Sequence, residues 1–268
     1  MKTHLNILNT VAEYQEYSAS TSYSKPNVTY VRENKVLYYD YGDNKPKPDF
    51  SKYKGEFSEI AEGGNTWFKS AITSVNYIPS GVTNLDNAFD SCFLLAKVPP
   101  IPSGVTRMEG TFRYCYKLVN APAIPSGVTN MKQTFMSCSS LTVAPEIPSG
   151  VTNMLSTFAH CSSLVTAPAI PSGVTEMNST FSNCSSLLNA PVVPSGVTFM
   201  LSTFYACEKL KTVTLLPTTP PYYNYILDWC TALESIFVPD ESVDAYKTAT
   251  GWSEFADKFK PLSSKPSE

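Results

Sequence analysis

Seven cysteines recur in this sequence, each 23 residues after the one before: Cys92, Cys115, Cys138, Cys161, Cys184, Cys207 and Cys230. Stacked repeats would bring neighbouring cysteine α-carbons to about 5 Å, where thiols can form disulfides or bind a soft metal. However, the number is odd, each cysteine belongs to an apolar pattern, and no histidine or second cysteine column accompanies it. We therefore expect reduced, inert thiols buried in the core.

The cysteine spacing is the period of a repeated unit, and copies begin at Ile78, Ile101, Ile124, Ile147, Ile170 and Val193. A fixed period in the twenties is typical of a solenoid, in which each unit forms one coil. One coil cannot bury its apolar side without neighbours. The repeat therefore predicts a stack of coils whose stability depends on contacts between them.

Four apolar residues of the unit that begins at Ile147 are spaced three, four and three apart: Val151, Met154, Phe158 and Cys161. This spacing predicts a short helix with one face directed at the core. Thr152 stands where the helix would begin, and its hydroxyl can accept a hydrogen bond from an amide of the first turn.

Turn and strand signals flank the predicted helix. Pro148 and Gly150 suit the second and fourth positions of a type I turn, which predicts a corner. Residues 164–167 predict a short strand that ends at Pro168, because proline donates no hydrogen bond to a strand ladder. The expected fold is an α/β solenoid, a leucine-rich-repeat array of short parallel strands and short helices.

The two ends differ from the repeat. Residues 28–31 and 36–41 predict a small β-hairpin rich in tyrosine. After Asp240 the pattern predicts a helical cap with two short helices, separated by Gly251. The expected division is a segment with the hairpin (1–50), a linker with a degenerate first coil (51–77), the solenoid (78–239) and the C-terminal cap (240–268).

Composition excludes several classes of function. The net charge is −3 and only 16% of residues are charged, so nothing predicts nucleic-acid binding. No stretch approaches 18 apolar residues, which argues against membrane insertion. The first 25 residues contain no apolar core of signal-peptide length, so the chain as given is not expected to be exported by the Sec route.

Catalysis has little support in the sequence. The two histidines are His4 and His160, and His160 fills a variable slot beside Cys161. We find no Ser/His/Asp set, no paired carboxylates in a common frame, no phosphate loop and no metal-ligand spacing. We therefore expect a protein that is not an enzyme, with no catalytic residue, cofactor or metal.

Tyrosines are the best candidates for contact with a partner, because exposed aromatic side chains are good anchors. They occur in the N-terminal segment, beside cysteines of the outer coils and before the C-terminal cap. The alternative is that these rings cover the ends of the core. The candidate partner-binding residues are Tyr30, Tyr38, Tyr41, Tyr114, Tyr116, Tyr205, Tyr222 and Tyr223.

The segments VTNMLSTFAHCSSLVTAPAIPSG and VTNMKQTFMSCSSLTVAPEIPSG resemble the BspA-like leucine-rich repeats of surface proteins from gut and oral bacteria. The resemblance covers residues 66–239. The tail SIFVPDESVDAYKTATGWSEFADKFKP is similar to the C-terminal cap of many such arrays in Bacteroidales. This resemblance implies adhesion through protein or glycan binding, without catalysis.

A second segment, YSKPNVTYVRENKVLYYDYGD, is similar to N-terminal segments of virion proteins from phages that infect Bacteroidales. This implies a homo-oligomeric structural, decoration or fibre protein of the virion, assembled in the host cytoplasm. Residues 1–50 would attach to other virion proteins, and the solenoid would bind host surface protein or glycan. The alternatives are a bacterial cell-surface adhesin recorded without its export signal, and a spacer with no ligand.

Overall fold

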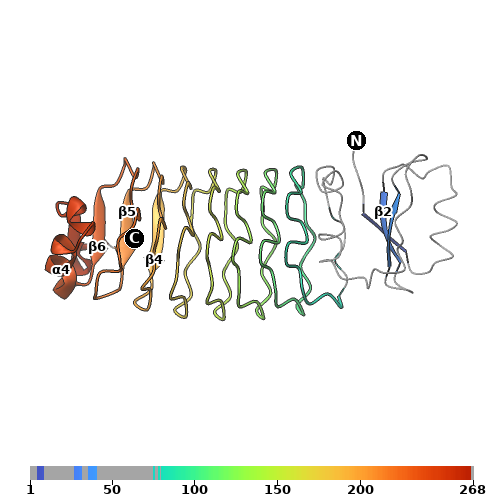
Figure 1. Ribbon diagram of the computed structural model, residues 1–268, viewed down its shortest axis with the longest axis horizontal. Coiled ribbons are helices and arrows are strands. Elements are labelled where there is room, and N and C mark those ends of the chain that lie inside the picture. Colours follow the sequence, from blue (N-terminus) through green and yellow to red (C-terminus); the bar gives the residue numbers. More distant parts are fainter. Residues whose placement is uncertain are drawn as a thin grey trace.

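The computed structural model describes residues 5–8, 27–31, 36–40, 75, 78 and 80–266. From residue 80 onward, successive coils stack side by side along one axis (Figure 1). Parallel bridges join the same position in neighbouring coils, for example Asn130 with Asn153 and Asn153 with Glu176. The predicted stack of 23-residue coils with parallel pairing is therefore confirmed.

The core consists of columns that run through the stack. In the coil that begins at Ile147, Val151, Met154, Phe158 and Cys161 are each 0% exposed. The phenylalanines of successive coils stack with ring centroids 5.5 to 5.7 Å apart, from Phe89 through Phe204. The residues predicted to face inward do form the core.

The predicted helix of each coil is wrong. Residues 154–161 form consecutive turns, in which Ser156 (φ 53°) and His160 (φ 61°) have left-handed backbones. Their amides alternate between two kinds of partner. The Thr157 N–H donates to Met154 O within the coil (3.1 Å), whereas the Phe158 N–H donates to Thr180 O of the next coil (2.9 Å). A helix would keep every amide within its own segment, so the apolar spacing of three and four arises here from turns.

Two flanking predictions are also corrected. Thr152 caps no helix, and its backbone N–H donates to Thr129 O of the preceding coil (3.0 Å). The corner is a turn, but it lies one residue later than predicted. The Val151 N–H donates to Pro148 O (3.0 Å), which makes Ser149 and Gly150 the central residues.

Regular strands form a sheet in the later coils. In the middle coils the predicted strand is reduced to single bridges, such as Thr166 with Asn189. There an Ala-Pro pair such as Ala167-Pro168 interrupts the ladder, and the same pair at residues 190–191 coincides with a shift in register between Asn189 and Val192. Val213 and Thr214 occupy the equivalent places in the next coil, where both can donate. The parallel sheet has the order β4 (Asn189–Val193), β5 (Thr212–Leu215), β6 (Ser235–Val238) and β7 (Phe259–Pro261).

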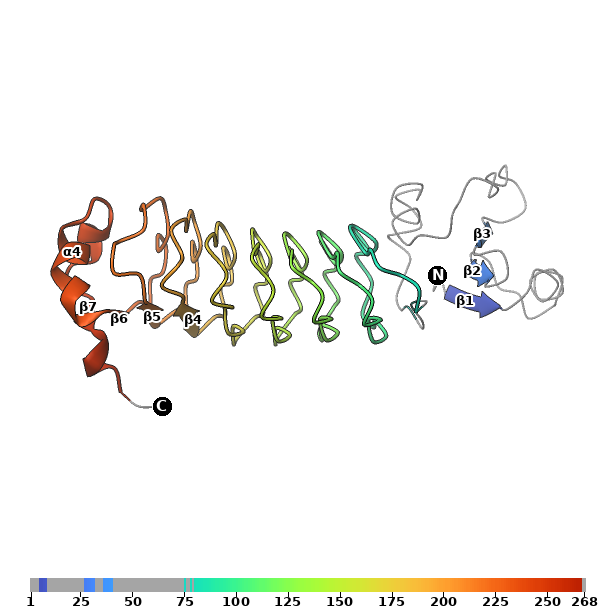
Figure 2. The same cartoon turned by 90° about the horizontal axis from the view of Figure 1, so that it is seen from below.

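The C-terminal segment packs against the last coil, at the opposite end of the stack from residue 80 (Figure 2). Tyr246 and Trp252 are buried, and each donates a hydrogen bond to the preceding chain: Tyr246 Oη to Pro217 O (3.0 Å) and Trp252 Nε1 to Pro221 O (2.7 Å). Besides β7, the segment contains η2 (Asp240–Ser242), α4 (Val243–Thr248), η3 (Trp252–Phe255) and η4 (Leu262–Ser264). Among the described residues, none of the helices has the length and apolarity to cross a membrane.

Near the N-terminus the structure has a three-stranded sheet, with β1 parallel to β2 and β2 antiparallel to β3. In the antiparallel pair, Tyr30 lies opposite Leu37 and Tyr38 lies opposite Thr29. Tyr41 and most of the predicted degenerate coil lie outside the described residues. The strands are β1 (Leu5–Leu8), β2 (Asn27–Val31) and β3 (Val36–Asp40).

Candidate binding surface

Two rows of side chains flank the buried cysteine column on the outside of the stack. If Ile147 is position 1 of its coil, Cys161 is position 15, and the rows are positions 14 and 16. Every member except Ser137 is at least partly exposed. We call them the outer rows: Ser91, Tyr114, Ser137, His160, Asn183, Ala206 and Trp229 at position 14, and Phe93, Tyr116, Ser139, Ser162, Ser185, Glu208 and Thr231 at position 16.

The backbone of position 14 is the same in every coil. All seven residues at position 14 have φ between 56° and 63°. Amides at position 14 donate hydrogen bonds to the next coil. The His160 N–H, for example, donates to Ser182 O (2.7 Å). At position 16 the Ser139 N–H donates back to Ser137 O (2.9 Å). Because the position 14 amides from Ser91 through Ala206 are already bonded, a partner that contacts this row is recognised mainly by side chains.

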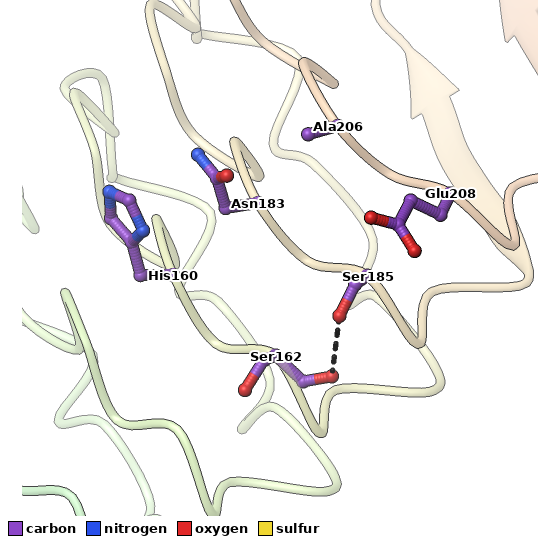
Figure 3. Close-up of a pocket in the computed structure, with 6 residues that line it drawn as sticks. All are labelled: His160, Ser162, Asn183, Ser185, Ala206 and Glu208. Atoms are coloured by element: carbon purple, nitrogen blue, oxygen red, sulfur yellow. Dashed lines mark hydrogen bonds between the residues drawn. The ribbon is translucent and has the colours of Figure 1, made fainter. Parts of the chain in front are cut away.

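The middle coils form a shallow trough of about 330 Å³ between the two rows. Figure 3 shows one row of three residues facing a second row of three across this trough. The Ser185 hydroxyl donates to Ser162 O (3.5 Å), and the Asn183 side-chain amide donates to Ser182 Oγ (2.9 Å). The trough is lined by His160, Asn183 and Ala206 on one side and by Ser162, Ser185 and Glu208 on the other.

Aromatic residues replace these small side chains toward the N-terminal coils. Phe93 and Tyr116 stack with ring centroids 5.4 Å apart and an interplanar angle of 11°. Tyr114 packs edge-on against Tyr116 at 6.3 Å, and the Arg113 guanidinium lies 5.6 Å from the centre of the Tyr114 ring. This cluster is held in place by its neighbours before any ligand arrives.

Arg113 is itself fixed by a paired contact with Asp90. Its Nε and Nη2 donate to the two carboxylate oxygens at 2.8 and 3.0 Å, and Nη1 donates to Gln133 Oε1 at 3.1 Å. The hydrogen bond with Asp90 raises the pKa of Arg113. The charge of Arg113 is therefore balanced within the protein, and its role is to position Tyr114.

The structure brings together only some of the predicted tyrosines. Tyr114 and Tyr116 are in contact, whereas Tyr205 lies half-buried at position 13 beside the trough. Tyr222 is 69% exposed, and it pairs with the exposed Phe199 of the preceding coil on a different side of the coil. Tyr30 and Tyr38 belong to β2 and β3.

Tyr223 is engaged in packing instead of standing free. Its ring contacts Trp252 at 5.1 Å and Phe255 at 5.9 Å, and its hydroxyl donates to Asp228 Oδ1 at 2.7 Å. Burial, with the hydrogen bond to Asp228, raises the pKa of Tyr223 far above its ordinary value. This side chain therefore joins the C-terminal segment to the last coil.

Several exposed residues were not among the sequence-based candidates. Asn183 and Ser162 line the trough, and Trp229, at the C-terminal end of its row, is 68% exposed. The sequence signal for Asn183 and Trp229 is variation, because position 14 changes between coils while position 15 is always cysteine, whereas Ser162 belongs to a run of serines at position 16.

All seven cysteines are free and buried, as predicted. Each thiol from Cys115 onward donates to the carbonyl of a phenylalanine in the preceding coil, for example Cys161 Sγ to Phe135 O at 3.1 Å. Burial raises the pKa of these thiols well above the ordinary cysteine value. In the part of the chain that the structure describes, no group of three His, Cys, Asp or Glu residues could hold a metal ion. The cysteine column is thus structural.

A protein-family model described as "BspA type Leucine rich repeat region" matches this chain in six copies, over residues 63–188 and 179–250. The chain belongs to this family. The matched residues include all the coils that carry the outer rows, so these rows are a feature of a BspA-type leucine-rich repeat array. A comparison with curated proteins finds no match.

Three solved structures are similar to this BspA-type chain. A leucine-rich repeat protein from T. pallidum is 27% identical, with 53% of this chain and 66% of that chain covered and a TM-score of 0.47. A leucine-rich cell surface protein from Faecalibacterium prausnitzii A2-165 is 23% identical, with 68% of each chain covered and a TM-score of 0.43. A leucine-rich repeat protein from Bacteroides ovatus is 19% identical, with 63% and 56% covered and a TM-score of 0.43. This chain thus spans just under two thirds of the T. pallidum protein.

Proposed function

We propose that this protein is a non-catalytic adhesin of the bacterial cell surface, which binds a partner through the side chains of its outer rows. One observation carries the proposal. Position 14 keeps the same left-handed backbone in seven coils while six different residue types occupy it, and position 16 changes from aromatic residues to serine and then to glutamate and threonine. A rigid scaffold that presents variable side chains at fixed places is the arrangement in which binding residues are commonly found. Membership of the BspA-type family supports a surface role.

The geometry of the trough supports binding over catalysis. His160 is exposed there, and within residues 80–266 its imidazole makes no hydrogen bond to a hydroxyl that could serve as a nucleophile. The Ser162 and Ser185 hydroxyls donate instead to backbone carbonyls of the preceding coils, at 3.4 and 3.5 Å. A nucleophilic hydroxyl must be within hydrogen-bond reach of its base, and neither serine hydroxyl is hydrogen-bonded to the His160 imidazole.

The ends of the chain take supporting roles in this proposal. Residues 240–268 act as a cap, because buried Trp252 and Tyr246 cover the last coil. Residues 1–50 form an attachment segment, 51–77 a linker with a first coil, and 78–239 the binding solenoid. Terminal caps are needed in solenoids, since an open core would aggregate.

The second candidate is a virion protein, favoured by the resemblance of residues 23–43 to N-terminal segments of phage virion proteins. These residues contain β2 and β3, which would contact other virion proteins and hold a homo-oligomer. The solenoid would then bind host surface protein or glycan.

Localisation in the source organism separates the two candidates. Antibody against residues 240–268 should label intact cells, and protease added to those cells should remove the label. Mass spectrometry of purified phage particles from the same culture provides the second readout. Abundant chain in particles, with unlabelled cells, would overturn the adhesin and favour the virion protein. Purified chain that binds neither cells, proteins nor glycans would leave the repeats as a spacer.

A further inference from the structure

In the outer row at position 16, aromatic side chains are replaced by serine after Tyr116. Phe93 and Tyr116 stack on each other, but the next coil has Ser139 at the same position. Within the described residues, the rings in contact with Tyr116 are those of Phe93 and Tyr114. Phe93 covers one face of the Tyr116 ring and the side chain is still 41% exposed, which makes the opposite face, toward Ser139, the candidate site for a further flat group.

Beyond this open face lies a row of small polar residues. Serines occupy position 16 in three successive coils, as Ser139, Ser162 and Ser185, before Glu208 ends the row. Stacked strands are about 4.8 Å apart, so four coil steps from Tyr116 to Glu208 span roughly 19 Å. The open surface is therefore long, narrow and polar, with an aromatic ring at one end and a carboxylate at the other.

The hydrogen-bonding groups of this surface favour one kind of ligand. The Ser162 and Ser185 hydrogens are donated to backbone carbonyls, which leaves their oxygens as acceptors. One N–H of the Asn183 amide donates to Ser182, and the Asn183 oxygen and the Glu208 carboxylate also accept, so the second Asn183 N–H and the His160 ring N–H are the donors among the lining residues. The six residues that line the trough include no lysine or arginine. Such a surface suits a neutral ligand rich in hydroxyl donors and disfavours an anion.

An extended peptide fits this surface less well. Peptides that bind as added strands need free backbone amides and carbonyls on the protein. Here the amides of position 14 are bonded to the next coil, as at Asn183 N to Tyr205 O (2.7 Å). A peptide would also bring carbonyl acceptors to a surface composed mainly of acceptors.

We propose that position 16 from Tyr116 to Glu208, together with the trough beside it, binds a neutral, extended glycan chain. One sugar ring stacks its C–H face on the open face of Tyr116, and the following units lie over Ser139, Ser162 and Ser185. The coil spacing is comparable to the length of one pyranose unit in an extended chain, so successive coils can contact successive sugars. This inference rests on the proposed binding function and names its ligand class.

The test uses the full-length protein on an array of neutral oligosaccharides of graded length, matched sulfated and uronate-containing oligosaccharides, and extended peptides. Neutral glycans should bind, and affinity should rise with chain length until the trough is filled. Tyr116→Ala should weaken Kd about tenfold, the scale of one ring contact. Ser162→Tyr, which places a ring in the trough, should abolish binding. Tyr222→Ala is the matched control, because Tyr222 is equally aromatic but lies at position 7, outside the outer rows.

Each result has a clear meaning. Neutral-glycan binding that Ser162→Tyr leaves unchanged would overturn the trough as the site. Peptide binding that Ser162→Tyr blocks, without glycan binding, would keep the site and overturn the ligand class. A blank array from protein that still binds cells would overturn the glycan inference and leave the adhesin proposal standing. Thermal unfolding of each variant shows whether it is folded. If Tyr116→Ala does not fold, Ser162→Tyr alone tests the trough as the binding site.

Discussion

The buried cysteine column and the outer rows lie one residue apart in every coil, yet the cysteine is constant whereas the outer side chains differ. Position 15 is cysteine in all seven coils, whereas position 14 is serine, tyrosine, histidine, asparagine, alanine or tryptophan. The amides of position 15 in every coil, and those of position 14 from Ser91 through Ala206, keep the same pattern of backbone hydrogen bonds. The backbone path is therefore set by the ladder and the core, and the outer side chains are free to serve recognition.

The core columns contribute more than apolar volume. Buried Thr157 donates its hydroxyl to Met131 O of the preceding coil at 2.9 Å, and Cys161 donates its thiol to Phe135 O at 3.1 Å. These carbonyls also accept the amides of their own turns, Thr134 N and Cys138 N, at 3.0 Å each. Threonine and cysteine thus supply second donors to buried carbonyls, which explains why these small residues recur there.

Alkaline pH should produce the largest difference between the two regions. Burial raises the pKa of Cys230 to about 12 and also raises the pKa of each thiol from Cys115 to Cys207. Above about pH 8.5 an unfolded thiol loses its proton while the folded one keeps it. The unfolded state is then favoured by roughly 1.4 kcal/mol per pH unit for each cysteine. Because six thiols act together, stability should fall by several kcal/mol within about one pH unit.

Circular dichroism across the alkaline range measures this loss. Cys161→Ala should make the fall in unfolding free energy less steep by about one proton. A stability that stays constant up to about pH 10 would contradict the burial of the thiol column.

Two single alanine substitutions in one coil, one in the core and one in the outer row, should give the next largest difference in stability. Phe158 is 0% exposed and stacks at 5.6 Å on both Phe135 and Phe181, so Phe158→Ala should cost about 3–5 kcal/mol. His160→Ala, two residues away in the outer row, should change stability by less than about 0.5 kcal/mol. Urea unfolding of both variants measures the contrast. Equal losses would mean that the outer row is part of the core.

Much of the core could be predicted from the sequence, because a period of 23 residues fixes which side chains share a column. The helices could not be excluded that way. In these turns the amides donate hydrogen bonds alternately within the coil and to the next coil. Such turns place Met154, Phe158 and Cys161 inward with the same spacing as a helix. The left-handed residues gave little warning, since Ser156 and His160 adopt φ values that are typical of glycine. Their geometry is imposed by hydrogen bonds to the next coil, which local sequence does not reveal.

The candidate surface was predictable only where it is aromatic. Tyr114 and Tyr116 are visible in the sequence because rings replace serines in their coil. Asn183 and Ser162 are ordinary polar residues, and only stacking shows that they line one trough. Tyr223 is adjacent to Tyr222 in sequence but is covered by Trp252, which is 29 residues further along the chain. Such long-range packing has no local signal.

A single hydroxyl should produce a smaller difference. Thr157→Val keeps the shape of a side chain that is 0% exposed but removes its hydrogen bond to Met131 O, with an expected cost of about 1 kcal/mol. Thr152→Val in the same coil changes an exposed threonine and should be nearly neutral. Thermal unfolding of the two variants side by side provides the measurement. A neutral Thr157→Val would show that the threonine column only fills space.

Glycine substitutions should produce the smallest effects, with opposite signs. Ala206 at position 14 has φ 56°, a conformation that costs an alanine about 1–2 kcal/mol and a glycine little. After the entropy that glycine loses on folding, Ala206→Gly should raise stability by about 1 kcal/mol or less. Ala159, at position 13, has no such backbone, so Ala159→Gly should lower stability by at least about 0.5 kcal/mol. Careful calorimetry of the two variants resolves these signs. Losses in both would mean that position 14 lacks its left-handed backbone.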